Sequence, residues 1–252
     1  MTTAVLLDIE GGIARITLNR PDRLNAFNDE MAEGWAEATA ATVASDDVHA
    51  IIVGAAGRAF CAGGDVRAMA TMDDRGDAIR DLAGRINSGI LALTESAKPV
   101  VAAAHGTTAG GGLGILLASD YAVIGESSKV GSLYGGVGLT PDLSVSTQLA
   151  AAVGERRALQ LLLQERLLSA DEAVDWGIAA EKVADDGVIE RAEAIAAFWV
   201  TNAHAYGEAK RLIRSRPERT FSEQLAEEAR TIGIASVSPE GDRRIKGFAA
   251  RG

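Results

Sequence analysis

Two glycine-bearing segments, each placed directly after a run of apolar residues, constrain the fold of this chain more than any other feature. The first is Phe60–Asp65, after the apolar run 50–53, and the second is His105–Gly114, after the apolar run 99–104. Glycine has no Cβ, so a buried strand that ends in glycines leaves its backbone N–H groups open to a ligand. Two such groups aimed at one oxygen form an oxyanion hole, which stabilises charge on a carbonyl oxygen. The pattern favours this chemistry at the N–H groups of Gly64 and Gly111.

Two other interpretations of these segments stay open from spacing alone. Glycine-bearing turns after strands are common, so both segments can be ordinary strand-to-helix turns. A phosphate-binding loop is the rival, but Gly110–Gly114 lacks the Lys-Ser/Thr ending of a P-loop, and no GxGxxG follows the first strand. Nucleoside triphosphate chemistry is therefore not expected.

Charge and cysteine content exclude several functional classes. The 252 residues carry a formal net charge of −10, whereas a nucleic-acid-binding surface needs clustered Lys and Arg. Cys61 is the only cysteine, so no internal disulfide can form. The first residues show neither a signal peptide nor a transit peptide, and no apolar run approaches the length of a membrane span. We expect a cytoplasmic protein with no nucleic-acid partner and no membrane partner.

The order of apolar and helical segments predicts an α/β fold. We expect strands at 4–9, 12–18, 50–53, 99–104 and 120–124. Gly11-Gly12 joins the first two strands as a hairpin turn. We expect helices after Asn28, over 76–95 and over 113–119. Strands that alternate with helices pair in parallel through right-handed crossovers.

From about residue 144 onward the pattern changes to consecutive helices. Ser169–Glu172 resembles a capping box that begins one of them, and Gly177 is placed to end it. Residues 190–214 are expected to form one long helix, followed by helices over 222–235 and 239–250. We therefore predict a core over residues 1–190 and a helical C-terminal region over residues 191–252.

Further sequence blocks accompany the glycine segments in a fixed order. The blocks are Leu18–Pro21, Leu24–Phe27, Phe60–Val66, Ala109–Leu113, Asp120, Ser169–Ala173 and Trp176-Gly177. Together they resemble the crotonase (enoyl-CoA hydratase/isomerase) superfamily from about residue 5 to residue 180. The resemblance implies a spiral of ββα units with a helical C-terminal trimerisation region, assembled as a homotrimer or homohexamer. It also implies an acyl-CoA thioester substrate and no separate cofactor, because coenzyme A is part of that substrate.

The same resemblance assigns roles to particular residues. It places the thioester carbonyl between the N–H groups of Gly64 and Gly111. It places substrate-binding positions at Ala62, Asp65, Val66, Tyr134, Arg23 and Ala26. Coenzyme A carries phosphates, so basic residues are expected at the mouth of the site, with Arg23, Arg67 and Lys246 as candidates.

The two glutamates with which hydratases of this superfamily deliver water are absent from this chain. Gly114 and Tyr134 stand at their positions. Asp142, directly after Pro141, is similar to the single acid of the ring-epoxide and Δ3,Δ2-enoyl-CoA isomerases. One carboxylate is enough to move a proton on an enolate held in an oxyanion hole. The sequence therefore favours a cofactor-independent acyl-CoA isomerase with Asp142 as the proton carrier.

Other interpretations of Asp142 and Tyr134 stay open. Asp142 can cap the helix that starts near Ser144. It also matches the nucleophile of dehalogenases in the superfamily, although those enzymes place a tryptophan at Tyr134 and a histidine near Asn87. A weak hydratase, an acyl-CoA hydrolase and a non-catalytic acyl-CoA-binding protein are further alternatives. Tyr134 is expected to form an aromatic wall or to donate a hydrogen bond to the acyl group.

The remaining reactive side chains give little indication of catalysis. Cys61 has no histidine near it in sequence, and small buried thiols are usually inert. His49, His105 and His204 have no metal-ligand spacing, so no metal site is expected. His105 stands at a strand end, where we expect it to bond to backbone.

Overall fold

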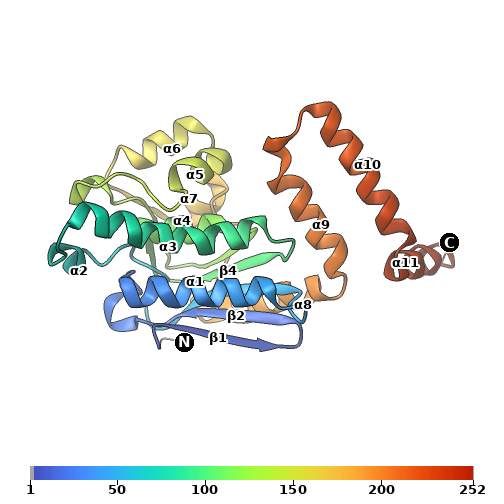
Figure 1. The fold of residues 1–252 in the computed structure, drawn as a ribbon, viewed down its shortest axis with the longest axis horizontal. Coiled ribbons are helices and arrows are strands. Elements are labelled where there is room, and N and C mark those ends of the chain that lie inside the picture. The colour runs from blue at the N-terminus through green and yellow to red at the C-terminus, as the bar shows by residue number, and fades with distance from the viewer. Residues whose placement is uncertain (1–2, 252) are drawn as a thin grey trace.

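The computed structural model describes residues 3–251, which form a sheet-based body and a helical C-terminal arm (Figure 1). The larger sheet of the body has the spatial order β1-β2-β3-β4-β6-β9. Its strands are β1 (Val5–Glu10), β2 (Ile13–Leu18), β3 (Ala50–Ala55), β4 (Val100–Ala104), β6 (Tyr121–Gly125) and β9 (Glu181–Val183). The smaller sheet, in the order β5-β7-β8, contains β5 (Thr107–Ala109), β7 (Lys129–Gly131) and β8 (Leu167–Ser169).

Strand pairing confirms the predicted hairpin and the parallel sheet. Val5 pairs with Leu18 and Glu10 with Ile13, which leaves Gly11 and Gly12 as a two-residue turn. Both glycines have positive φ, at 62° and 81°, as the tight turn between twisted strands requires. From β2 to β9 every neighbouring pair in the large sheet is parallel.

Helices cover both faces of the large sheet. The body contains α1 (Asp29–Ala44), α2 (Val66–Ala70), α3 (Arg75–Glu95), α4 (Gly111–Ala118), α5 (Val145–Val153), α6 (Glu155–Leu162), α7 (Ala170–Trp176) and α8 (Val188–Val200). Helices α1 and α3 run side by side (Figure 1), joined where the buried Trp35 donates its indole N–H to the Ile86 carbonyl at 3.1 Å. The predicted capping box is present, because Ser169 and Glu172 satisfy each other's backbone N–H groups at the start of α7.

The opposite face of the sheet is covered by α8. Val188, Ala192 and Ala196 of this helix pack with Ile52 and Val101 in a second apolar cluster. The expected division at residue 190 falls inside α8, which packs against β3 and β4 as part of the body.

The single long helix expected over 190–214 is wrong, because α8 ends at Val200 and α9 (Ala203–Arg214) begins three residues later. Asn202 adopts a non-helical backbone with φ −151° and ψ 54°. The Thr201 hydroxyl donates to the Phe198 carbonyl at 2.7 Å. Thr and Asn side chains compete with the helical backbone for hydrogen bonds, which favours a break where two of them are adjacent.

Helices α9, α10 (Phe221–Val237) and α11 (Pro239–Ala249) form the arm, which extends away from the body to the C-terminus (Figure 1). A buried ion pair anchors it. Lys210 of α9 lies 2.9 Å from an Asp120 carboxylate oxygen and also donates to the carbonyls of Leu93 and Lys98. Arg214 bonds the other Asp120 oxygen at 3.0 Å. Within residues 3–251, no helix is long and apolar enough to cross a bilayer.

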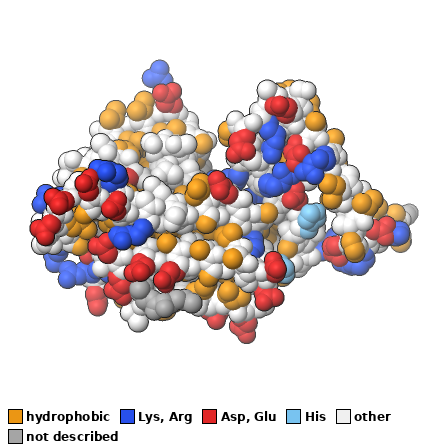
Figure 2. Space-filling view, viewed as in Figure 1, with side chains coloured by type: hydrophobic (Ala, Val, Ile, Leu, Met, Phe, Trp, Pro, Cys, Tyr) orange, Lys and Arg blue, Asp and Glu red, His pale blue; other side chains and the backbone are white. Residues whose placement is uncertain are grey.

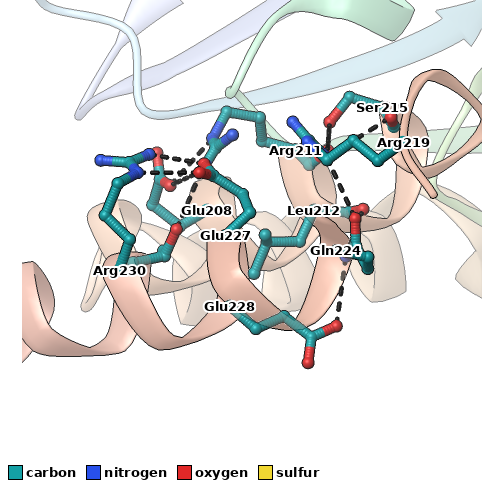
Figure 3. A network of polar contacts seen from close by, with 10 residues as sticks. Glu208, Arg211, Leu212, Ser215, Arg219, Gln224, Glu227, Glu228 and Arg230 are labelled. Carbon is teal, nitrogen blue, oxygen red and sulfur yellow. Dashed lines mark hydrogen bonds and ion pairs between the residues drawn. The ribbon is translucent and has the colours of Figure 1, made fainter. Parts of the chain in front are cut away.

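Charged side chains also hold α9 and α10 together (Figure 3). Glu227 of α10 accepts hydrogen bonds from Arg211 of α9 at 2.7 Å and from Arg230 at 2.8 Å. Arg219 reaches both the Ser215 hydroxyl and the Gln224 amide oxygen, which closes the turn between the helices. The hairpin of α9 and α10 is therefore fixed by polar contacts rather than by a core of its own.

Candidate active site

The two glycine segments lie against each other because the first pairs with β5. The Cys61 N–H donates to the Thr107 carbonyl, and the Ala109 N–H donates back to the Cys61 carbonyl at 2.9 Å. A Cβ on Gly63 would lie 3.1 Å from the Ala109 oxygen and 3.3 Å from the Gly111 nitrogen. Gly63 also has φ 105°, so both its backbone conformation and its surroundings require glycine.

The N–H groups of Gly64 and Gly111 have no internal acceptor among residues 3–251. Phe27 bonds the residues on either side of Gly64, donating to the Gly63 carbonyl at 2.8 Å and accepting from the Asp65 N–H at 2.9 Å. Gly111 is the first residue of α4, where the backbone N–H groups of a helix lack intrahelical partners. The positive end of the helix dipole favours negative charge at the same place.

A cavity of about 210 Å³ lies against both glycine segments. Its other walls come from α2, α3 and the segment 133–143, and they are almost entirely apolar. The lining side chains include Phe27, Val66, Met69, Ile79, Leu82, Ile86, Leu133, Val137, Leu139 and Leu143. Among the lining residues described by the structure, Tyr134 and Asp142 carry the polar side chains. The cavity therefore presents one carboxylate beside two unpaired amides.

Asp142 lies at the rim of the cavity, exposed on one side to solvent, and its carboxylate is held by Tyr134. The Tyr134 hydroxyl donates to Asp142 Oδ1 at 2.6 Å. Partial burial raises the pKa of Asp142, and hydrogen bonds from Tyr134 and from the backbone of Asp142 oppose that rise. Burial, followed by the negative charge of Asp142, raises the pKa of Tyr134, so the phenol stays a donor.

The helix-cap interpretation of Asp142 is not supported by its contacts. Helix α5 begins at Val145 and its N-cap is Ser144, with no side-chain cap hydrogen bond. Asp142 contributes its backbone carbonyl, which accepts the Val145 N–H at 3.0 Å. The carboxylate is directed to Tyr134 instead of to the helix end.

The turn after Asp142 fills the space beside α4. Leu143 and Ser144 both have positive φ, at 48° and 67°, which is uncommon outside glycine. A Cβ on Gly114 would lie 2.1 Å from the Leu143 carbonyl oxygen, and one on Gly111 would lie 2.6 Å from Leu143 Cδ1. Any side chain at position 114 would therefore displace the turn that carries Asp142.

Of the predicted substrate-binding residues, Ala62, Val66 and Tyr134 line the cavity. Asp65 does not: it caps α2 by accepting the Ala68 N–H, and it pairs with Arg20 at 3.1 Å. Burial opposes ionisation of Asp65, but the Ala68 N–H and Arg20 together hold the pKa of this carboxyl below its usual value. The Arg20–Asp65 pair thus fixes the first glycine segment to the preceding loop.

The basic residues expected near coenzyme A lie outside this cavity. Arg23 ends a 3-10 turn over Pro21–Arg23, and the carbonyl of Ala26 accepts a hydrogen bond from Arg20. Arg67 lies on the exposed side of α2. Lys246 is on α11 of the arm, paired with Asp242 at 2.7 Å.

The other reactive side chains have structural contacts. His105 Nε2 lies 2.7 Å from the Gly57 carbonyl oxygen, which confirms the expected bond to backbone. Burial raises the pKa of the Cys61 thiol to about 12, so it is not a nucleophile at neutral pH. Among residues 3–251, no group of three or more His, Cys, Asp or Glu side chains could hold a metal ion.

Sequence reasoning located two parts of the cavity wall without assigning individual residues. The segments 76–95 and 130–150 were expected to line the acyl pocket, and the structure confirms this with Leu82 and Ile86 of α3 and with residues 133–143. The contribution of Phe27 and Met69 depends on long-range packing, for which the sequence carries no local signal.

Comparison with known proteins identifies the family. The model of the enoyl-CoA hydratase/isomerase family matches residues 8–247. A 1,2-epoxyphenylacetyl-CoA isomerase from Escherichia coli K12 is 31% identical over 100% of this chain and 97% of its own length. A trans-2-decenoyl-[acyl-carrier-protein] isomerase from Streptococcus mutans is 31% identical over 69% of this chain and 67% of its own length.

Solved structures agree with the sequence relatives. The crystal structure of an enoyl-CoA hydratase from Mycobacterium smegmatis superposes with a TM-score of 0.91 at 26% identity, covering 98% of this chain and 96% of the other. With the family model matched over nearly the whole length, the resemblance seen in the glycine segments is confirmed. The chain belongs to the enoyl-CoA hydratase/isomerase family of the crotonase superfamily.

Proposed function

We propose that this chain is a cofactor-independent acyl-CoA isomerase that moves a proton, and with it a double bond, on a thioester enolate. The observation that carries the proposal is the single carboxylate, Asp142, at the rim of an apolar cavity that also holds the free N–H groups of Gly64 and Gly111. Two similar proteins bear isomerase names and others bear hydratase names, so the choice between the two activities rests on the single carboxylate.

In the proposed mechanism the thioester oxygen accepts hydrogen bonds from Gly64 and Gly111. Asp142 removes a proton from the carbon next to the carbonyl, and the electron pair moves into the carbonyl to give an enolate. The two N–H groups stabilise the oxyanion, and one such donor typically contributes about 3 kcal/mol to lowering the barrier. In a 3-enoyl thioester this enolate is conjugated with the double bond, so Asp142 can return the proton to the fourth carbon while the carbonyl reforms and the double bond moves to the second and third carbons. The reaction consumes no water and needs no redox partner.

The wall of the cavity indicates an uncharged acyl group. A charged group at its end would lose its hydration among Leu82, Ile86 and Leu133 without gaining an ionic partner. Gly114 leaves no place for a second acid, because even a methyl group there would meet the Leu143 carbonyl. Syn-addition of water needs both an acid and a base in reach of the double bond, so this arrangement disfavours hydration.

The test compares Asp142→Asn with the parent on 3-enoyl-CoA and ring-epoxide acyl-CoA substrates, with mass and chromatographic analysis of the products. We expect isomerisation by the parent, with no change of mass, and a fall of about 10²- to 10⁴-fold in kcat for the variant. Asp186→Asn, an exposed aspartate far along the chain, is the matched control and should retain parent activity.

Other products would overturn the proposal in distinct ways. A gain of one water in the parent reaction would show a hydratase, and release of free thiol would show a hydrolase. Tight binding of acyl-CoA without any turnover across a broad panel would show a binding protein. Parent activity in Asp142→Asn would remove Asp142 from the mechanism.

We also propose that the arm packs against further copies of the chain, as a homotrimer or a homohexamer. Ile232, Val237 and Phe248 are 71%, 80% and 82% exposed, and a groove of about 740 Å³ separates α3 and α5 from α9 (Figure 2). Apolar surface of this kind is typical of an interface between proteins. Light scattering should give three or six times the chain mass, and Ile232→Asp with Val237→Asp should lower it; a monomeric parent would contradict the proposal.

A further inference from the structure

The phenol of Tyr134 is committed to Asp142. Its oxygen lies 2.6 Å from Asp142 Oδ1, and Tyr134 is a buried residue, 8% exposed. Besides Tyr134, no side chain of residues 3–251 donates a hydrogen bond to the Asp142 carboxylate, and the other donor to it is the backbone of Asp142 itself. The two carboxylate oxygens of Asp142 are therefore unequal, because only Oδ1 is held by another side chain.

We propose that Tyr134 is a positioning residue, which holds Oδ1 of Asp142 so that Oδ2 alone takes and returns the substrate proton. The inference rests on the proposed function and concerns the same site. It replaces the expectation that Tyr134 donates a hydrogen bond to the acyl group, because its single hydroxyl proton is already used.

The backbone supports a fixed position for this donor. The Tyr134 carbonyl accepts the N–H groups of Val137 at 3.2 Å and Leu139 at 3.0 Å, which closes the turn between Tyr134 and Asp142. An aspartate at an exposed rim would otherwise sample several side-chain rotamers. The hydrogen bond selects one of them before substrate binds, and this preorganisation lowers the cost of reaching the reactive geometry.

One further carboxylate, that of Glu165, lies against the turn that follows Tyr134, where a Cβ on Gly136 would be 3.3 Å from it. Tyr134, just before the 3-10 turn Gly135–Val137, is the titratable group that contacts Asp142. The Cys61 thiol acts on Tyr134 in turn. Helices α2 and α3 present apolar side chains to the cavity, and α4 presents glycine. No Lys, Arg, His or second carboxylate is among the lining residues of the described chain.

In this mechanism Tyr134 stays protonated throughout the reaction, and only Asp142 gains and loses a proton. Asp142 starts as a carboxylate, receives one proton from carbon on Oδ2, and releases that proton to another carbon. Tyr134 keeps its own proton throughout, because burial and the neighbouring carboxylate raise its pKa. A hydrogen bond to the ionised form stabilises the carboxylate, so loss of the phenol raises the pKa of Asp142 further.

The test is the pH dependence of kcat/KM for Tyr134→Phe, with Tyr206→Phe of α9 as the matched control. Activity falls as Asp142 becomes protonated, so the acidic limb reports its pKa. We expect this limb to move up by about one pH unit in Tyr134→Phe, with kcat reduced about tenfold and KM little changed. Tyr206→Phe should give the parent profile. Tyr134→Leu removes the same donor with a different shape and should move the limb in the same direction.

A carboxylate titration of Asp142 by ¹³C NMR, assigned with Asp142→Asn, measures the same pKa without turnover. An unchanged acidic limb and an unchanged titration in Tyr134→Phe would overturn the positioning role while leaving Asp142 as the base. Full activity in Asp142→Asn would instead overturn the proposed function itself. The two failures are therefore distinguishable.

Discussion

Helix α4 and the arm helices α10 and α11 show opposite solutions to burying apolar side chains. All eight residues of α4 are buried, and none of them carries a polar side chain. On α10 and α11 the large apolar residues Ile232, Val237 and Phe248 are exposed instead. The body completes its core within one chain, whereas the arm does not. Exposed apolar residues are not confined to the arm, because Val66, Val137 and Leu139 beside the candidate cavity are exposed as well.

Two lysine–aspartate pairs sharpen this comparison and give the largest expected difference in stability. Lys210–Asp120 joins the arm to the body, and the Lys210 side chain is 3% exposed. Lys246–Asp242 lies on α11, with the lysine side chain 75% exposed. Removing one partner of a buried ion pair leaves the other charge buried without a partner, which reduces stability. An exposed ion pair contributes little to stability.

We expect Lys210→Ala to reduce the free energy of unfolding by about 3 kcal/mol. Besides Asp120, the carbonyls of Leu93 and Lys98 lose their donor in this variant. Lys246→Ala should leave the unfolding free energy nearly unchanged. Denaturant unfolding of both variants measures the difference, and equal stabilities would show that the arm is not anchored through Lys210.

Helical glycines give a second, smaller contrast. Gly114 of α4 faces the Leu143 carbonyl, whereas a Cβ on Gly84 of α3 would meet nothing within 4 Å. Gly114→Ala should cost about 1–3 kcal/mol by overpacking, and it should also lower kcat because Leu143 carries Asp142 with it. Gly84→Ala should stabilise the helix by about 0.5–1 kcal/mol. Thermal unfolding and kinetics of both variants check this, and a fully active, equally stable Gly114→Ala would contradict the steric argument.

The elements that sequence predicted correctly are those whose signals are local. Gly11-Gly12 specifies its own turn, and Ser169 finds its capping partner three residues later in Glu172. The break at Thr201-Asn202 was missed because neither residue forbids a helix, and apolar spacing continues on both sides.

The candidate site was predictable in part for the same reason. The glycine segments and Asp142 are visible as short motifs, and the cavity brings Gly64, Gly111 and Asp142 together. The bond between Tyr134 and Asp142 joins residues eight positions apart, and the sequence carries no local signal for it. The positive φ of Leu143 and Ser144 is likewise not predicted by their residue types. The contact of Asp65 with Arg20 is equally non-local, so its place outside the cavity could not be seen from its motif.

Deuterium incorporation is the most direct test of enolate formation at this site. An acyl-CoA with a CH2 group next to the thioester and no chain double bond, such as phenylacetyl-CoA, is incubated with the protein in D₂O, and mass spectrometry follows exchange at that carbon. If Asp142 removes the proton while the Gly64 and Gly111 amides stabilise the enolate oxygen, the parent should exchange well above the rate in buffer alone. Asp142→Asn should exchange at the buffer rate. Exchange at the parent rate in Asp142→Asn, or none above buffer in the parent, would contradict this mechanism.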